Sequence, residues 1–116
     1  SHKSSNLKKY YMASVVNSVH NIPIRLTEER WIHIVENPNE MAGYYDKVLD
    51  AVAKPKWVVQ GYHDELWAIM EISENKVLLA VYKEIKSEND GFIITAFFTS
   101  QLQKLKRRKM IWIQKQ

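Results

Sequence analysis

Two side chains that could act together on a phosphate lie one turn apart on a predicted helix. The helix covers residues 27–36, and its polar side holds Arg30 and His33, with Asn37 just beyond. An imidazole titrates near ~6.5 and can act as a general acid or base, and a guanidinium can grip a phosphate with two parallel hydrogen bonds. The opposite side of the helix is apolar, with Ile32 at its margin and with Trp31, Ile34 and Val35 at its centre. The alternative is that Arg30 and His33 are simply solvated polar residues.

Hydroxyl groups and one lysine supply further candidates on predicted strands. Thr95 shares a strand face with Ile93 and Phe97, so its hydroxyl stands among apolar groups and needs a partner, which could be a substrate phosphate or a backbone carbonyl. Tyr82 and Lys83 end the preceding strand and point to opposite faces. Thr99 and Ser100 stand at the start of a predicted helix, where backbone amides could bind an anion.

Charge is concentrated at the two ends of the chain. The net charge is +4, yet residues 31–100 carry six basic and eleven acidic side chains. Residues 101–116 carry no acidic residue and six basic ones: Lys104, Lys106, Arg107, Arg108, Lys109 and Lys115. This asymmetry favours a polyanionic partner bound at one edge of the fold, although a solvated helix surface is the alternative. A membrane-surface element over Lys104–Ile113 is a further possibility with a short apolar part.

Several classes of chemistry lack the residues they need. The chain has no cysteine, which excludes disulfides and thiol catalysis, and no glycine-rich phosphate loop or metalloprotease motif. His20 precedes a predicted strand, and His63 lies with Asp64 and Glu65 in a polar turn that matches no zinc spacing. We therefore expect no cofactor and no metal. No apolar run approaches the ~20 residues of a membrane span, so we expect no membrane partner and a cytoplasmic location.

The elements expected to position these residues form an α+β domain. The alternation at residues 22–26 predicts a short edge strand, because Pro23 cannot donate to a ladder. Thr27 is expected to cap the first helix, and Asn37-Pro38-Asn39-Glu40 to start a second one that ends at Lys54-Pro55. Strand-like runs at residues 57–60, 66–72, 76–84 and 91–98 predict sequential antiparallel neighbours, followed by a short helix to about Arg108 and a last strand at residues 110–113. The predicted fold is a helical hairpin packed on one face of a curved, four- to five-stranded antiparallel sheet.

Two stretches of the chain, together with the order of elements, resemble a known group of nucleases. The stretches are RLTEERWIHIVE followed by NPNEMAGYYDKVLDAVAKP, and VLLAVYKE followed by DGFIITAFFTS. They resemble the small prokaryotic and phage nucleases grouped as barnase, EndoU, colicin and RelE (BECR), over about three quarters of the chain. The resemblance implies a RelE/barnase-like fold and a metal-independent endoribonuclease that acts as the toxin of a toxin–antitoxin module and is blocked by a cognate antitoxin protein.

The resemblance also implies roles for particular residues. RNA would be cleaved by transphosphorylation, in which a 2′-hydroxyl attacks the adjacent phosphorus. His33, Tyr82, Thr95 and Arg30 would form the catalytic group. The expected substrate-binding residues are Arg25, Lys83, Thr99, Ser100, Lys104, Arg107 and Arg108. The alternative function is a non-catalytic module that binds RNA or a protein through the basic C-terminal segment.

The expected domain organisation is simple. At 116 residues the chain is expected to form one domain. Residues 1–11 read as a disordered or tag-derived N-terminus, and residues 12–116 as a single nuclease-like domain. The oligomeric state is left open by the sequence.

Overall fold

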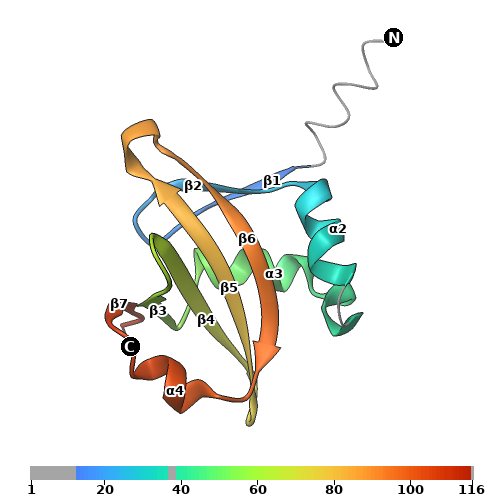
Figure 1. Ribbon diagram of the computed structural model, residues 1–116, viewed down its shortest axis with the longest axis vertical. Coiled ribbons are helices and arrows are strands. Elements are labelled where there is room, and N and C mark those ends of the chain that lie inside the picture. The colour runs from blue at the N-terminus through green and yellow to red at the C-terminus, as the bar shows by residue number, and fades with distance from the viewer. Residues whose placement is uncertain (1–12, 37–38, 116) are drawn as a thin grey trace.

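The fold is built on a seven-stranded mixed β-sheet, as seen in a computed structural model (Figure 1). The structure describes residues 13–36 and 39–115, so the prediction for residues 1–11 lies outside the described residues. The spatial order of the strands is β1-β2-β6-β5-β4-β3-β7. Their bounds are β1 Ser14–Asn17, β2 Pro23–Leu26, β3 Trp57–Gln60, β4 Glu65–Ser73, β5 Lys76–Ile85, β6 Asp90–Thr99 and β7 Met110–Ile113.

This sheet corrects the predicted fold class. The chain forms seven strands instead of four or five, and the β2–β6 pair is parallel, so the sheet is mixed. The predicted order of antiparallel neighbours from β3 to β6 is confirmed. The expected edge strand is internal, because β1 pairs with β2 on its free side. Pro23 is tolerated there because it is the first residue of the strand.

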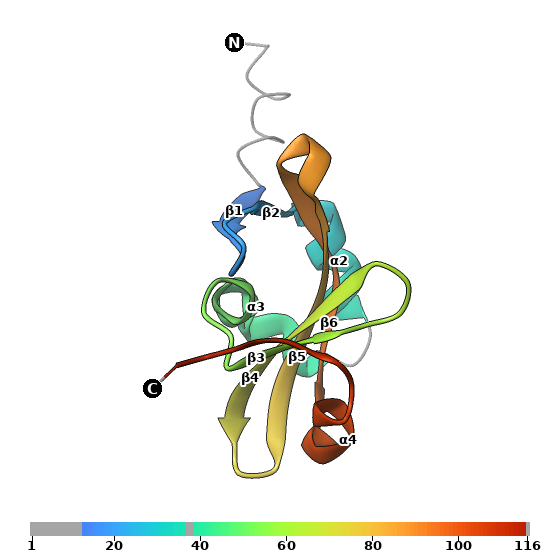
Figure 2. The same cartoon turned by 90° about the vertical axis from the view of Figure 1, so that its left-hand side faces the viewer.

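The helices lie on both faces of the sheet instead of forming a hairpin on one. The α-helices are α2 Glu28–Glu36, α3 Tyr45–Ala53 and α4 Leu102–Lys106, and short 3-10 helices cover Asn39–Gly43 (η1) and Lys86–Glu88 (η2). Helices α2 and α3 pack on the larger core, whereas α4 packs on a second core on the opposite face. Figure 2 shows α3 and α4 on either side of the central strands. The second face is covered because Leu105 buries its side chain there.

Strand β5 explains why the sheet needs cover on both faces. Its residues from Val77 to Tyr82 are all buried, and they alternate between the two cores. Leu78, Ala80 and Tyr82 face α2 and α3, whereas Val77, Leu79 and Val81 face α4. A continuous apolar run is typical of a strand that is covered on both sides.

The first helix begins and faces as the sequence predicts. Thr27 Oγ1 accepts a hydrogen bond from the Arg30 amide at 3.1 Å, so Thr27 caps α2. The predicted second helix is interrupted, since η1 ends at Gly43 and α3 begins at Tyr45. The predicted capping residues Asn37 and Pro38 lie outside the described residues. None of the helices described is long and apolar enough to cross a membrane.

Candidate nucleic-acid interface

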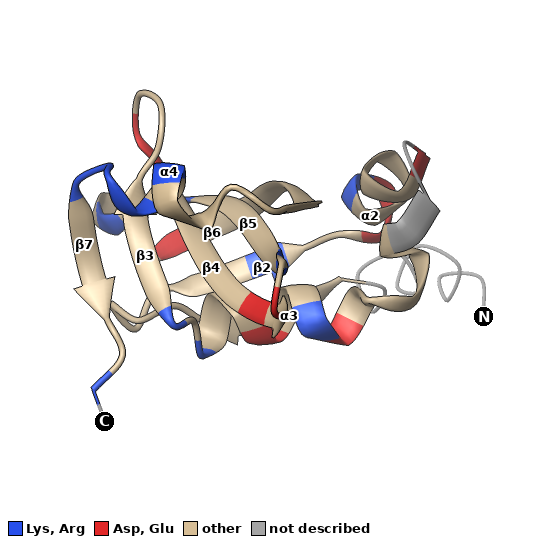
Figure 3. Cartoon of the chain, turned by 90° about the horizontal axis from the view of Figure 1, so that it is seen from below, with Lys and Arg blue, Asp and Glu red and all other residues tan. Residues whose placement is uncertain are grey.

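The basic C-terminal segment is held on the sheet by α4. Leu105 is buried and Leu102 packs beside it in the second core. A five-residue helix is too short to be stable alone, so this burial is what fixes it. Four basic residues of the segment remain exposed to solvent: Lys104, Lys106, Arg107 and Lys109. Figure 3 shows these charges gathered on α4 and on the segment that leads to β7.

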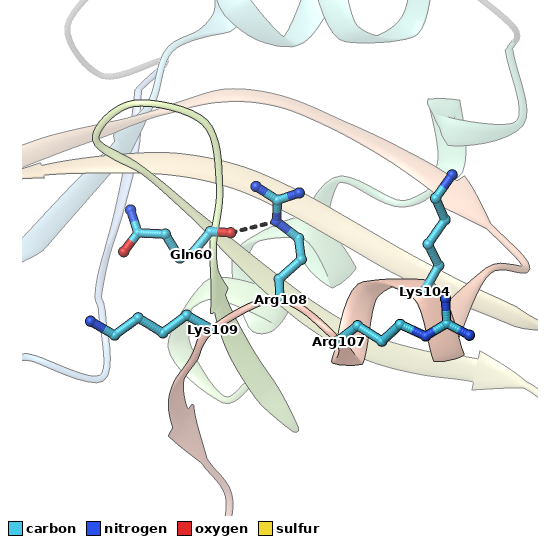
Figure 4. A pocket seen from close by; sticks show the side chains of 5 residues that line it. All are labelled: Gln60, Lys104, Arg107, Arg108 and Lys109. Atoms are coloured by element: carbon cyan, nitrogen blue, oxygen red, sulfur yellow. Dashed lines mark hydrogen bonds between the residues drawn. The ribbon is translucent and has the colours of Figure 1, made fainter.

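Arg108 connects this basic segment to two aromatic rings. Its guanidinium carbon lies 4.4 Å from the centroid of the Trp67 ring and 4.9 Å from that of Tyr62. Its Nε donates a hydrogen bond to the Gln60 carbonyl oxygen at 2.6 Å (Figure 4). A guanidinium over an aromatic face is attracted by the ring quadrupole, so Arg108 holds the Tyr62 and Trp67 rings beside the cationic segment.

The Trp67 indole can lie here because Gly61 has no side chain. A Cβ atom at residue 61 would overlap the indole ring. Trp67 Nε1 also donates to the Glu65 carboxylate at 3.2 Å, and the Tyr62 ring meets Trp67 edge to face with centroids 5.3 Å apart. The strand register adds Phe97 to the same sheet face, since Trp67 pairs with Val81 and Phe97 pairs with Leu79.

Two hollows lie side by side on this face. An aromatic cavity of about 210 Å³ is lined by Tyr62, Trp67, Phe97 and Thr99, together with Leu79, Gln101, Lys104, Leu105 and Arg108. A basic hollow of about 410 Å³ is lined by Gln60, Lys104, Arg107, Arg108 and Lys109 (Figure 4). Lys104 and Arg108 line both. We call these two hollows together the aromatic–basic surface.

Exposure separates this surface from ordinary core packing. Tyr62 is 61% exposed and Phe97 is 44% exposed, although both line a cavity with Leu79 and Leu105 of the second core. Large aromatic rings left open to solvent beside cations mark a binding surface more often than rings that are sealed in a core. The arrangement can therefore offer flat apolar faces and positive charge to one ligand.

The predicted catalytic residues are dispersed. Arg30 and His33 are exposed on α2, and His33 Nδ1 lies 3.7 Å from the Glu36 carboxylate. Tyr82 is fully buried in the core under α2 and α3. Thr95 pairs with Val81, so its side chain lies on the α4 face, opposite that of Tyr82. One phosphate cannot meet Tyr82 and Thr95 together, so this structure does not bring the predicted catalytic group into one site.

Burial also fixes the protonation state of Tyr82. Desolvation raises the pKa of its hydroxyl far above the ordinary value, and the nearby Glu84 carboxylate raises it further. Within the described residues the hydroxyl has no hydrogen-bond partner. A neutral, enclosed phenol of this kind is a packing residue in the arrangement that we observe.

The predicted substrate-binding residues divide into two groups. Lys104, Arg107 and Arg108 lie on the aromatic–basic surface, with Thr99 at its rim. Arg25 lies elsewhere and is held by Asp90, through contacts of 3.1 and 2.8 Å. The hydrogen bond from Arg25 lowers the pKa of the Asp90 carboxyl. Lys83 lines a separate cavity, and Ser100 is exposed just before α4.

The predicted anion site at the last helix is not formed as expected. The helix begins at Leu102, and the Gln101 amide donates to Thr99 Oγ1 at 3.1 Å. Thr99 therefore closes a local turn ahead of α4.

Sequence reasoning missed the aromatic half of the interface. Tyr62, Trp67 and Phe97 belong to a turn and two strands, and nothing in their spacing shows that they meet. The signal that could have found them is the pair Gly61-Tyr62, because a glycine before an aromatic turn residue permits close ring packing.

Comparisons with known proteins add no assignment, because no family model, curated protein or solved structure matches this chain. Within the described residues, no three histidine, aspartate or glutamate side chains are grouped so that they could hold a metal ion.

Proposed function

We propose that this protein binds single-stranded RNA on the aromatic–basic surface. The observation that carries the proposal is the stacking of Arg108 on Tyr62 and Trp67, beside the exposed ring of Phe97 and the basic hollow. Unpaired bases stack on aromatic rings, and their phosphates contact lysine and arginine side chains. Both kinds of group are present on this surface within one continuous pair of hollows.

A single strand fits this surface better than a duplex. The bases of a duplex are stacked on one another, so they cannot use exposed rings such as Tyr62 and Phe97. One hollow holds the rings and the next holds only polar and basic residues, with Lys104 and Arg108 at the boundary, which suits a chain that places its bases and its phosphates on different sides. The choice of RNA over DNA rests on the resemblance to the BECR nucleases.

The test is the affinity of a fluorescently labelled RNA oligonucleotide, measured by anisotropy. Phe97→Ala and Tyr62→Ala should each weaken binding about 5- to 150-fold, which is the value of one base stacked on an aromatic ring. The double variant Lys104→Gln/Arg107→Gln should also weaken binding. Its matched control is Lys47→Gln/Lys54→Gln, which removes two exposed charges from the region of α3, on the other face.

Equal affinities for the two double variants would contradict the proposed surface. Tighter binding of the same sequence as single-stranded DNA would move the proposal to DNA. A different outcome is that the protein binds neither RNA nor DNA and captures an acidic protein. If Lys104→Gln/Arg107→Gln abolished that capture, the alternative of a protein-binding module would be favoured.

RNA cleavage is a second candidate function. The resemblance implies a metal-independent endoribonuclease of the toxin type, silenced by a cognate antitoxin. The observation that favours cleavage is the hydrogen bond between His20 and the buried Glu84, in a cavity that shares the lining residue Gln60 with the basic hollow. Total RNA incubated with the protein in EDTA should be degraded, and an acidic antitoxin that covers the basic hollow should block both binding and degradation. Intact RNA at every protein concentration would contradict this second function.

A further inference from the structure

The basic hollow gathers four cations that have no carboxylate partner. They belong to α4 and to the segment after it: Lys104, Arg107, Arg108 and Lys109. Within the described residues none of the four is in an ion pair, whereas Arg25 and Lys56, elsewhere on the molecule, are each paired with an acidic side chain. No aspartate or glutamate of the described residues lines either hollow. Like charges that are gathered in this way repel one another, so the hollow suits an anion that carries more than one negative charge.

Arg108 holds the boundary that the two hollows share. Its Nε donates to the Gln60 carbonyl at 2.6 Å, and its guanidinium carbon lies 4.4 Å from the centroid of the Trp67 ring (Figure 4). Its two terminal nitrogens have no hydrogen bond within the described residues. Because the guanidinium is already held by these contacts, those nitrogens can donate to phosphate oxygens from a fixed position.

The two hollows together have the size of a site for one nucleotide. Their volumes are about 210 and 410 Å³, and taken together they fall within the range of ~300–1,000 Å³ that small-ligand sites occupy. A base stacked on the Tyr62 or Phe97 ring has its phosphate near the basic hollow, because Lys104 and Arg108 line both hollows. The surface can therefore hold the base and the phosphate of the same nucleotide.

Charge separates a phosphate at the end of a strand from one within it. A phosphodiester inside the strand carries one negative charge, whereas a terminal phosphomonoester carries about 1.5 to 2 at neutral pH and has three oxygens that accept strong hydrogen bonds. Four cations without a counter-charge around one hollow are matched better by the terminal group.

We propose that the basic hollow binds the terminal phosphomonoester of a single-stranded RNA, with the last base of the strand in the aromatic cavity. The proposal rests on the proposed binding of single-stranded RNA and names the part of the strand that is recognised. Arg107 and Lys109 line the basic hollow alone and contact the phosphate, whereas Lys104 and Arg108 lie between the phosphate and the base. A 5′-phosphate and a 3′-phosphate share this chemistry, and the experiment distinguishes the two ends.

The probe is one RNA sequence, labelled internally with a fluorophore and prepared with different ends. The forms have hydroxyls at both ends, a 5′-phosphate, a 3′-phosphate, or no end because the strand is circular. Measured by anisotropy, one of the two phosphorylated forms should bind the full chain about 10- to 150-fold more tightly than the hydroxyl form, which is the usual value of a hydrogen bond to a charged group. The circular form should not exceed the hydroxyl form. A methyl ester on the terminal phosphate removes one charge and should remove most of the gain.

Three variants separate the phosphate from the base. Arg107→Gln/Lys109→Gln should abolish the gain from the terminal phosphate, because both side chains line only the basic hollow. Phe97→Ala should weaken the binding of every form and leave the ratio between the phosphorylated and hydroxyl forms unchanged. Lys47→Gln/Lys54→Gln is the matched control, since it removes two exposed charges from the region of α3 and should keep both the affinity and the ratio. Circular dichroism checks the fold of each variant, and the single variants Arg107→Gln and Lys109→Gln replace the double one if it is unfolded.

Each outcome separates this proposal from the proposed function. Equal affinities of the hydroxyl form and both phosphorylated forms overturn the end recognition and leave the binding of single-stranded RNA standing. Equal gains from a phosphate at either end also overturn it, because they reflect added charge alone. A gain that persists in Arg107→Gln/Lys109→Gln overturns it by placing the phosphate outside the basic hollow. Absence of binding by every form contradicts the proposed function itself.

Discussion

At the scale of single residues, the interface depends on a glycine, which has no side chain. Gly61 leaves the space that the Trp67 indole occupies, and Arg108 then stacks on the indole and on Tyr62. The position of the cationic segment is thus linked to the absence of one Cβ atom. The glycine is needed here for close approach, since its φ is not in the left-handed region.

Gly61→Ala should displace the Trp67 ring and destabilise the protein by about 1–3 kcal/mol, the usual effect of overpacking. RNA affinity should fall as well, because Arg108 loses its platform. Thermal unfolding and anisotropy measure the two effects. Gly43→Ala is the control, since a Cβ there meets nothing within 4 Å, and similar losses in both variants would contradict the role of Gly61.

The buried hydroxyl of Tyr82 should make the protein less stable at high pH. Tyr82→Phe should raise the free energy of unfolding by about 1 kcal/mol, because it removes a buried group without a partner among the described residues. The raised pKa means that the unfolded chain ionises first. Stability is therefore complete below about pH 10, the ordinary pKa of tyrosine, and falls as the pH rises beyond it.

The measurement for Tyr82 is urea unfolding at pH 8 and at pH 10.5. The wild type should lose more stability between these values than Tyr82→Phe does. Equal losses in the two proteins would show that the Tyr82 hydroxyl is not the group responsible.

At the scale of elements, the helix that carries His33 is fixed by its cap and by one apolar side. Thr27 caps α2, and Ile34 is buried while His33 remains exposed. These features follow from local spacing, and the sequence predicts them correctly. The helix thereby presents Arg30 and His33 to solvent instead of to the sheet.

Thr27→Ala should destabilise the protein by about 1 kcal/mol, because the Arg30 amide loses its acceptor. Thr27→Ser keeps the hydroxyl and should stay close to the wild type. Chemical denaturation measures both variants. A loss in Thr27→Ser as large as that in Thr27→Ala would mean that the methyl group, and not the cap, is what matters.

Helix α4 shows where prediction from local spacing ends. Its five residues are too few to indicate which face of the sheet they cover, and the chain places them opposite α2 and α3. The buried contact of Leu105 sets where the basic residues of the segment lie. The prediction of a helix here was therefore correct, whereas the face that the helix covers is decided by the whole sheet.

At the scale of the whole molecule, several basic side chains gather at one surface. Lys104 and Arg107 line a hollow on the α4 side together with Arg108 and Lys109. Binding of a single strand releases condensed counterions, so the logarithm of the affinity falls linearly with the logarithm of the salt concentration. The slope of that line is about −0.7 for each phosphate contact.

Lys104→Gln/Arg107→Gln should reduce that salt slope by about 1.4, which corresponds to two lost phosphate contacts. Lys47→Gln/Lys54→Gln should leave the slope unchanged, because those lysines lie away from the aromatic–basic surface. Anisotropy titrations at several salt concentrations measure both slopes. A reduced slope in the second variant alone would place the RNA on the α3 face.

The sequence by itself determined the local features: the cap at Thr27, the exposed side of α2, the antiparallel run from β3 to β6 and the basic C-terminal segment. Each depends on residues within a few positions of one another, through helical or strand periodicity and charge. Only the tertiary structure decided that α4 crosses to the other face, that Tyr82 and Thr95 part to opposite faces, and that Arg108 meets Tyr62 and Trp67. It also brought His20 to Glu84, 64 positions away. Such contacts depend on strand order and on long-range burial, which periodicity along the chain does not encode.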